Sequence, residues 1–316
     1  HGAGGDAGHL MTRLAAVLGR GWMGRPLVIA VPSVWLALFF LAPFAIMFYI
    51  SWVDMGNDIL PFKPLWDEAS GVLRLRFDNY TSLWRSDQGH WFDTLYVDAY
   101  LRSVWYAALS ACICLLVGYP FAYAMTRADA RWRPLLLLMV MLPFWTSLLL
   151  RVYAWKGLLA DQGMVNQVLL FLGLVQTAPV LLYTDVSLLV GMAYVYLPFM
   201  VLPLYAALSK QNPQWLEAAY DLGCTPWRAF WIVTVPLSWR GIGAGMILVF
   251  VPSLGEFVIP SLLGGPENLM IGRVLWDEMF TANNWPRASA LATVMVLAIV
   301  VPLVWYARVA AKDDRG

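Results

Sequence analysis

Charged side chains are scarce in this sequence. Asp, Glu, Lys and Arg together make up 13% of its 316 residues, against roughly 25% in a typical soluble domain. Hydrophobic residues reach 60% and aromatic residues 15%, so we expect part of the chain to be solvated by lipid rather than by water. The formal net charge is only +1, which argues against nucleic acid as a partner because no strongly basic surface is available.

Cysteine and histidine are equally rare, with three of each. No two of Cys112, Cys114 and Cys224 form a CxxC pair, so the sequence predicts neither a disulfide framework nor a zinc site. Two of the histidines lie in a Gly-rich leader, which leaves His90 alone. An integral-membrane enzyme would need His, Asp or Glu side chains that converge near one face. These histidines cannot form such a cluster, so we expect no metal site and no catalysis.

Nucleotide and hydrolase motifs are also missing. The sequence contains no GxxxxGKS/T phosphate loop, no GxSxG elbow and no HExxH. Gly241, Gly243 and Gly245 begin an apolar run instead of following a strand, so they do not form a dinucleotide-binding fingerprint. We therefore expect the chain to bind no cofactor of its own.

Long apolar runs are what the sequence does contain. A helix needs about 20 apolar residues to cross a bilayer, and we predict six spans at 27–52, 99–126, 135–157, 181–209, 241–264 and 289–309. No small-residue cleavage site follows the first run, so we expect a retained anchor rather than a cleaved signal peptide. The pattern predicts an all-α integral membrane protein with a leader at 1–26, a transmembrane domain at 27–309 and a tail at 310–316.

The segments between these runs differ in charge. One set holds the basic residues Arg13, Arg20, Arg25, Arg127, Arg131, Arg133, Lys210, Arg228, Arg240, Arg308, Lys312 and Arg315. The other set includes the long 53–98 loop, with Asp54, Asp58, Asp67, Glu68, Asp78, Asp87, Asp93 and Asp98. Because short basic loops stay in the cytoplasm, we predict that both termini and the 210–240 loop are cytoplasmic.

The 210–240 loop is more ordered than a simple connector needs to be. Asn212 and Pro213 are a helix cap followed by a first-turn proline, and Gly223 suits the left-handed conformation that ends a helix. Thr225 and Pro226 repeat the start signal, so the pattern predicts two short helices joined at a glycine. Such a rigid projection is either a docking surface for another protein or an amphipathic hairpin that rests on lipid headgroups.

This stretch resembles the EAA signature of the permease subunits of bacterial ABC importers, which reads EAA, three residues, Gly, nine residues, Ile, one residue, Leu-Pro. Glu217, Ala218, Ala219, Gly223 and Pro236 match at the right spacing, whereas Val233 and Val235 replace the branched aliphatic residues. The resemblance implies a six-helix type I importer permease fold with cytoplasmic coupling helices, in the bacterial inner membrane. It also implies that an ATPase subunit dimer, which carries ATP and Mg, docks on Glu217, Ala218, Ala219, Asp221, Gly223 and Pro226.

The fifth run, 241–264, has helix breakers and a charge near its centre. Pro252, Gly255 and Pro260 interrupt the helical pattern, and Glu256 lies among them. A carboxylate at membrane depth costs roughly 2.5–3.5 kcal/mol on insertion scales, and broken helices are tolerated where their backbone lines a cavity. We expect Glu256 to line a polar substrate pathway; the alternative is that it is protonated or paired with a basic residue of a partner subunit.

Further pathway candidates are acidic or aromatic: Asp185, Trp145, Tyr153, Trp155, Tyr194, Tyr196 and Phe257. As a set, carboxylates and aromatic faces favour a cationic substrate. Taken singly, each is better explained by helix packing or by an interfacial aromatic belt. Arg151 and Lys156 oppose a cationic pathway, but both fall at a predicted span end, where such side chains can snorkel to the interface.

Three segments resemble the putrescine/spermidine permeases: VYAWKGLLADQGMVNQ, YVYLPFMVLPLYAAL and GEFVIPSLLGGPENLMIGRVLWDEMF. The similarity runs over nearly all of 26–309 and implies polyamine import together with a second homologous permease. It further implies a periplasmic polyamine-binding protein that docks on 53–98, 159–180 and 265–288. Within the same family, a cationic amino acid, an opine or a metal is the alternative substrate. A stand-alone secondary transporter would show internal repeats, and we find none.

Overall fold

The computed structural model describes residues 24–56, 61–63, 65–67, 72–73, 76–83 and 95–313. Residues 1–23 of the predicted leader, residues 314–316 of the predicted tail and much of the 53–98 loop, including His90, lie outside the described residues. The described chain is almost entirely helical. Its strands β1 (Trp66–Asp67) and β2 (Val72–Leu73) form one short antiparallel pair, with Trp66 opposite Leu73.

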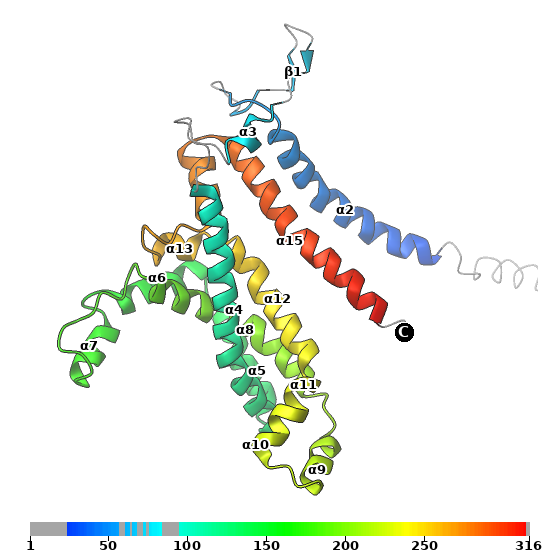
Figure 1. Cartoon of the computed structure of the whole chain (residues 1–316), viewed down its shortest axis with the longest axis vertical. Coiled ribbons are helices and arrows are strands. Elements are labelled where there is room, and N and C mark those ends of the chain that lie inside the picture. The colour runs from blue at the N-terminus through cyan, green and yellow to red at the C-terminus, as the bar shows by residue number, and fades with distance from the viewer. Residues whose placement is uncertain are drawn as a thin grey trace, which may run out of the picture.

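Three long helices form the central bundle: α4 (Leu95–Arg127), α8 (Asp185–Leu208) and α12 (Trp239–Leu254). Each of the three packs against the other two (Figure 1). Small residues recur on one face of α4 at helical spacing, and all of them are buried: Ala107, Ala111, Cys114, Gly118 and Ala122. Small side chains at this spacing let helix backbones approach closely, which is how helices associate where lipid removes the hydrophobic drive between them.

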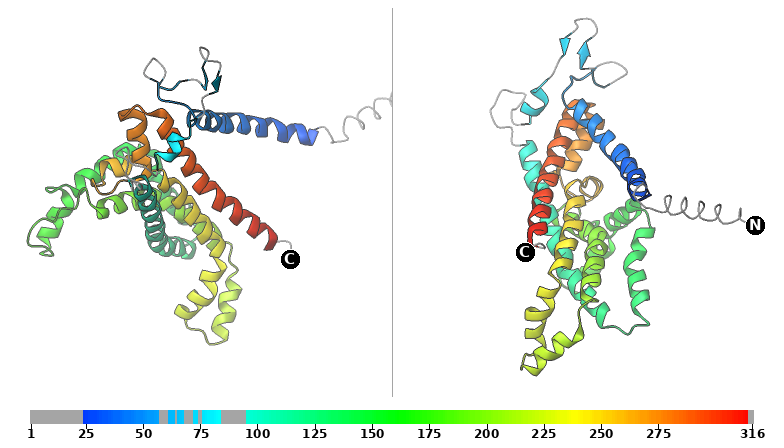
Figure 2. Two further views of the ribbon diagram at one scale, coloured as in Figure 1. Left: turned by 45° about the horizontal axis from the view of Figure 1, so that its top comes forward. Right: turned by 90° about the vertical axis from the view of Figure 1, so that its right-hand side faces the viewer.

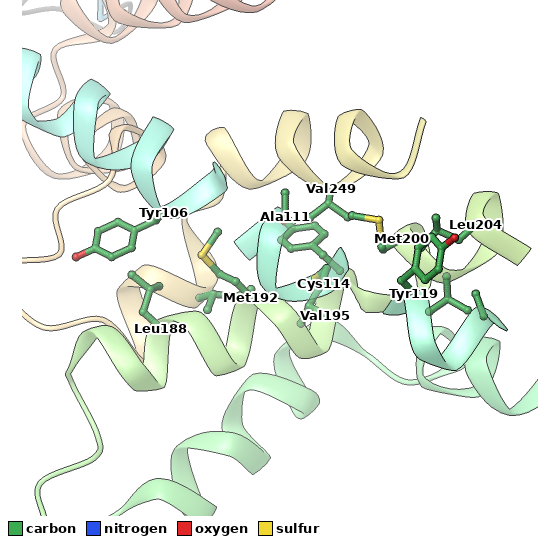
Figure 3. Packing of buried hydrophobic residues seen from close by; sticks show 14 of the residues in the cluster. Tyr106, Ala111, Cys114, Tyr119, Leu188, Met192, Val195, Met200, Leu204 and Val249 are labelled. Atoms are coloured by element: carbon green, nitrogen blue, oxygen red, sulfur yellow. The ribbon is translucent and has the colours of Figure 1, made fainter. Parts of the chain in front are cut away.

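Glycine fixes the closest approach between α12 and α8. A Cβ on Gly245 would lie 2.6 Å from the sulfur of Met200, and one on Gly241 would lie 2.5 Å from the Cβ of Ala207. The space between the three helices is filled by flexible and branched side chains such as Leu188, Met192 and Met200, none of which is exposed (Figure 3). Methionine suits this position because its unbranched chain fills irregular gaps.

The terminal helices α2 (Gly24–Ile50) and α15 (Trp285–Asp313) form a separate pair beside the bundle. They pack on each other, and α15 also contacts α3 (Asp78–Thr81), α14 (Ile271–Trp276) and η3 (Asp277–Thr281). A second, smaller core joins α15 and α14 to α4 and contains Leu83, Tyr96, Ala99, Ile271, Val274 and Leu291. Figures 1 and 2 show that the pair meets the bundle at one end and diverges from it toward the other.

The predicted span 135–157 is not one straight helix. It comprises α5 (Arg133–Met141), the 3-10 turn η1 (Leu142–Trp145) and α6 (Leu148–Leu159), followed by α7 (Met164–Phe171). The axis turns by 90° between η1 and α6. Pro143, at the second position of η1, lacks the N–H that an α-helix needs. As a result α6 and α7 extend sideways from the bundle (Figure 1).

Among the described residues, α2 from Ile29, α4 and α8 are each long and apolar enough to cross a membrane. Two bent helix pairs also meet that test if each pair counts as one span, and Trp285–Val300 of α15 is a shorter apolar stretch. The division into six spans stays a prediction. The predicted interruption of 241–264 is present, since α12 ends at Leu254 and α13 (Val258–Leu262) begins after a break. The break does not fall at the prolines, because Pro252 lies within α12 and Pro260 within α13.

Candidate coupling surface and substrate pathway

Residues 213–237 form a helical hairpin at one end of the bundle (Figure 1). Its first arm is α9 (Pro213–Asp221), and its second comprises α10 (Pro226–Ala229), the π-turn η2 (Phe230–Thr234) and α11 (Val235–Leu237). The Asn212 side chain caps α9 by accepting a hydrogen bond from the Gln214 N–H at 3.1 Å, as predicted. Thr225 precedes α10 as predicted but makes no side-chain capping bond.

Gly223 ends α9 with φ = +82°, which confirms the predicted glycine stop. The Gly223 N–H donates to the Tyr220 carbonyl and the Cys224 N–H to the Ala219 carbonyl, at 2.9 and 3.0 Å. This pairing satisfies carbonyls that the end of a helix would otherwise leave free. The sequence signals therefore produce the helix, glycine and helix arrangement that they predict.

The hairpin presents most of its predicted coupling residues to its surroundings. Glu217, Ala218, Asp221, Gly223 and Pro226 are exposed, and Ala219 is buried on the inner side of α9. Five large apolar side chains are also more than half exposed: Trp215, Leu222, Trp227, Trp231 and Ile232. Exposed aromatic side chains beside polar residues are typical of a protein interface, where aromatic residues are enriched at the centre and polar residues form the rim.

The second arm of the hairpin is attached to the bundle by aromatic packing. Phe230 contacts Tyr119 and Tyr123 of α4 edge to face, with ring centroids 5.6 and 5.3 Å apart. The Tyr119 hydroxyl lies 2.8 Å from the Ser238 hydroxyl, and the Gln211 side chain donates to the Thr234 carbonyl at 3.0 Å. These contacts join the hairpin to α4 on one side and to the end of α8 on the other.

A cleft of about 520 Å³ lies between α9 and the adjoining ends of α4 and α8. Its charged lining comes from Arg127, Arg133 and Glu217. The Arg133 side chain donates to the carbonyls of Thr126 and Ala128, at 2.8 and 3.0 Å, so it also closes the end of α4. Glu217 therefore belongs both to the exposed face of the hairpin and to the rim of a polar cleft.

Glu256 lies at the break between α12 and α13 and is only 8% exposed. Its Oε1 accepts hydrogen bonds from the Val258 and Ile259 N–H groups, at 2.9 and 3.4 Å. Its Oε2 accepts the Tyr196 hydroxyl at 2.5 Å. The carboxylate thus caps the start of α13 and ties the break to α8, and these donors offset much of the cost of burying a charge.

The start of α14 packs closely on the same break. A Cβ on Gly272 would lie 2.5 Å from the carbonyl oxygens of Gly255 and Glu256, so only glycine fits without a backbone shift. The Ile271 N–H donates to the buried Ser103 hydroxyl of α4 at 2.7 Å. Phe257 stacks on Trp276 with ring centroids 4.6 Å apart and an interplanar angle of 6°. The break is therefore held by α8 and α14, and α14 is in turn bonded to α4.

The other predicted pathway residues do not join Glu256 in one cluster. Asp185, exposed at the start of α8, accepts the Tyr106 hydroxyl at 2.8 Å, and the same hydroxyl lies 3.1 Å from Asn268 Oδ1. Trp155 packs edge to face on Tyr194 at 5.6 Å. Trp145 and Tyr153 are 77% and 54% exposed. The predicted residues thus lie at several separate contacts along the bundle.

Some residues of these contacts escaped prediction. Tyr106 and Asn268 at Asp185, and Trp276 beneath Phe257, are remote from their partners in the sequence. Their signal was slight: one of five tyrosines in α4, and polar residues in a segment after the break. No group of three or more His, Cys, Asp or Glu side chains suited to a metal ion occurs among the described residues.

The chain resembles known transport proteins. Residues 115–312 match the family model of the binding-protein-dependent transport system inner membrane component. The chain is 35% identical over 284 residues to the spermidine/putrescine transport system permease protein PotB of Haemophilus influenzae, covering 89% of this chain and 93% of that protein. It is 36% identical over 244 residues to PotB of Escherichia coli, covering 76% and 86% of the two chains.

A solved structure shares the fold. The crystal structure of a bacterial ABC transporter involved in the import of the acidic polysaccharide alginate aligns with a TM-score of 0.62 and 17% sequence identity, over 95% of this chain and 99% of that chain. The fold predicted from the sequence, that of a type I ABC importer permease, is therefore confirmed.

Proposed function

The chain belongs to the family of binding-protein-dependent transport system inner membrane components, and we propose that it is one of two permease subunits of an ATP-driven importer of polyamines, putrescine or spermidine or both. The observation that carries the substrate assignment is the 35% identity to a spermidine/putrescine permease over 89% of this chain and 93% of the relative. Similarity over almost the whole of both chains favours a shared role better than similarity confined to the hairpin.

The hairpin is the coupling element of this proposal. Its exposed residues Glu217, Ala218, Asp221, Gly223 and Pro226, with Ala219 behind them, are where an ATPase subunit dimer docks. ATP and Mg are bound and hydrolysed on that dimer, and this subunit is non-catalytic and binds no cofactor. The aromatic attachment of Phe230 to α4 supports the assignment because it connects the docking face to the bundle.

The remaining partners follow from the same scheme. The hairpin and both termini face the cytoplasm, and the opposite end receives a periplasmic polyamine-binding protein. A second, homologous permease completes the pathway, and lipid of the inner membrane covers the rest of the apolar surface. In support, most described side chains of α2 are exposed, and an apolar groove of about 710 Å³ lies between α4 and the second arm of the hairpin. Neither surface is covered by the residues that the structure describes.

The substrate pathway in this scheme runs past the helix break. Asp185 and Glu256 supply carboxylates, and Tyr196 and Phe257 supply aromatic surface beside the break. Trp145, Tyr153, Trp155 and Tyr194 extend the aromatic surface along α6 and α8. Carboxylates and aromatic faces attract the ammonium groups of a polyamine, and they would repel an anionic solute.

The test of coupling is transport in vesicles that contain the complete importer. We expect vanadate-sensitive polyamine uptake by the assembled complex and none by this chain alone. Glu217→Lys and Gly223→Pro should abolish uptake driven by ATP while the subunit still inserts into the membrane. Asp129→Lys, a charge reversal at an exposed position between α4 and α5, is the matched control and should transport normally. Uptake by the isolated chain, or undiminished uptake by both hairpin variants, would contradict the proposal.

The test of substrate class is competition. Uptake of labelled spermidine should be inhibited by putrescine and spermidine and not by lysine, an opine or a divalent metal ion. Inhibition by a cationic amino acid or a metal at lower concentration than by polyamines would leave the importer assignment intact and replace its substrate.

A further inference from the structure

The apolar groove beside the hairpin adjoins the polar cleft at the same end of α4. The groove has a volume of about 710 Å³ and the cleft about 520 Å³, and Tyr123 lines both. Leu116 and Trp227, on opposite walls of the groove, are 76% and 73% exposed, so no described residue covers them. The groove is lined mainly by apolar and aromatic side chains, among them Leu115, Leu116 and Tyr119 of α4 and Trp227, Phe230 and Trp231 of the hairpin.

The sequence of α4 places this groove at the depth of one leaflet. The helix carries no charge over 103–126, between Arg102 and Arg127, a length of roughly 36 Å at 1.5 Å per residue. This is close to the thickness of the hydrocarbon core, about 30 Å. The α4 residues that line the groove, from Cys112 to Tyr123, lie between the middle of the uncharged stretch and Arg127. Because charges are costly in hydrocarbon, Arg127 marks the headgroup level and the groove lies at acyl-chain depth.

Arg127 is the cation at the junction of groove and cleft. Its Nη2 donates to the Tyr123 hydroxyl at 2.9 Å, and its guanidinium carbon lies 5.1 Å from the centroid of the same ring. The side chain is exposed, so its remaining N–H groups can reach a ligand. Arg133 also lines the cleft, but it donates to two carbonyls at the end of α4. Glu217 lines the α9 wall, and two arginines against one carboxylate leave this lining net positive.

Another apolar groove in the same chain provides a contrast. It has a volume of about 400 Å³ and is lined by Val117 of α4, Trp155 of α6 and Tyr194 of α8, among others. No Lys or Arg is among the described residues that line it. Lys156, which follows Trp155 in the sequence, lies over the Tyr183 ring. Acyl chains can enter both grooves, but of the two the groove beside the hairpin has a net positive cleft next to it.

We propose that an anionic phospholipid of the cytoplasmic leaflet binds at this junction, with an acyl chain in the groove and its phosphate on Arg127. Such a molecule supplies both the apolar tail and the anion that the two adjoining cavities call for. Basic pockets at membrane helices on the cytoplasmic side bind anionic headgroups, and Trp and Tyr are enriched at this level. The choice of leaflet rests on the proposed function, which places the hairpin in the cytoplasm. A lipid bound here would lie between the second arm of the hairpin and α4.

Photolabelling tests the site within the chain itself. The full chain is placed in phosphatidylcholine nanodiscs with a trace of phosphatidylglycerol or phosphatidylcholine that carries a diazirine on an acyl chain, and labelled peptides are identified by mass spectrometry. We expect the phosphatidylglycerol probe to label residues 226–235 roughly fivefold more than the phosphatidylcholine probe, the factor that one arginine contributes near a membrane surface. Residues 189–197, on the other groove, should be labelled equally by both. Equal labelling of 226–235 by the two probes would overturn the proposal.

Matched variants separate the headgroup contact from the groove. Arg127→Gln should remove the preference for phosphatidylglycerol, whereas Arg131→Gln should keep it, because Arg131 lies beside Asp129 at 3.6 Å and does not line the cleft. Leu116→Trp fills the groove and should abolish labelling of 226–235. Val117→Trp, one residue further on, lines the other groove and should not. Loss of the preference in both arginine variants alike would contradict a phosphate contact at Arg127.

The assembled importer distinguishes a lipid from a second permease as the occupant. Labelling of 226–235 by the phosphatidylglycerol probe should persist when the second permease and the ATPase subunits are present. Its disappearance on assembly would show that another subunit covers the groove and would overturn the proposal. Failure of the chain to assemble with a second permease, or to transport polyamines, would instead contradict the proposed function and leave the labelling of the full chain unaffected.

Discussion

Gly223 offers a quantitative test of whether the shape of the hairpin matters. Its φ of +82° lies in the left-handed region, and a Cβ added there would meet nothing within 4 Å. The cost of Gly223→Ala is therefore conformational and not steric, about 1–2 kcal/mol for a residue with a side chain in that region. A penalty of this size lowers the population of the described hairpin roughly 5–30-fold relative to alternatives. Asn tolerates the left-handed region better than other residues, so Gly223→Asn should lose much less.

The assay is polyamine uptake per ATP hydrolysed in vesicles that contain the complete importer. Gly223→Asn is the matched control, because nothing lies within 4 Å of the Cβ position at Gly223 and Asn tolerates the left-handed region. We expect coupling to fall for Gly223→Ala and to stay closer to normal for Gly223→Asn. Normal coupling in Gly223→Ala would refute the role of the hairpin geometry.

Three further substitutions test the helix break and its surroundings by thermal unfolding of the purified subunit. Glu256→Ala leaves three donors without an acceptor, and each unpaired buried group destabilises the fold by about 1–3 kcal/mol. Its unfolding midpoint should therefore fall well below that of Glu256→Gln. Equal midpoints would contradict the capping role. Gly272→Ala places a Cβ 2.5 Å from two carbonyl oxygens and should destabilise by about 1–3 kcal/mol, whereas Gly243→Ala, with open space around it, should not. Tyr106→Phe removes the hydroxyl beside Asp185 and Asn268 and should cost about 1 kcal/mol; an unchanged midpoint would show that these contacts are not stabilising.

The hairpin was predictable because its signals are local. Asn212, Pro213 and Gly223 each act on backbone within a few residues, through a cap, a first-turn proline and a left-handed stop. The break beside Glu256 was predictable for the same reason, since Gly255 and the neighbouring prolines weaken the helix wherever it packs. The family fold followed from a spaced motif whose residues lie within one loop.

The contacts of the pathway residues were not predictable, because they join distant parts of the chain. Tyr196 and Glu256 are 60 residues apart, and Tyr106 and Asn268 are 162 residues apart. That Arg151 can snorkel to the interface from a predicted span end stays a prediction. The structure buries two of its guanidinium nitrogens beside the 90° bend. No pattern in the sequence indicates that Pro143 and its neighbours redirect the axis so sharply.

The pairing of α2 with α15 has a consequence for how the protein is made. The first long apolar helix finds its main intramolecular neighbour in the last helix of the chain. During synthesis and membrane insertion, more than 200 residues are added between α2 and α15, so the contact between these two helices forms late. A chain truncated before Trp285 would lack α15, and α2 would then have no helix to pack on even if α4, α8 and α12 had assembled.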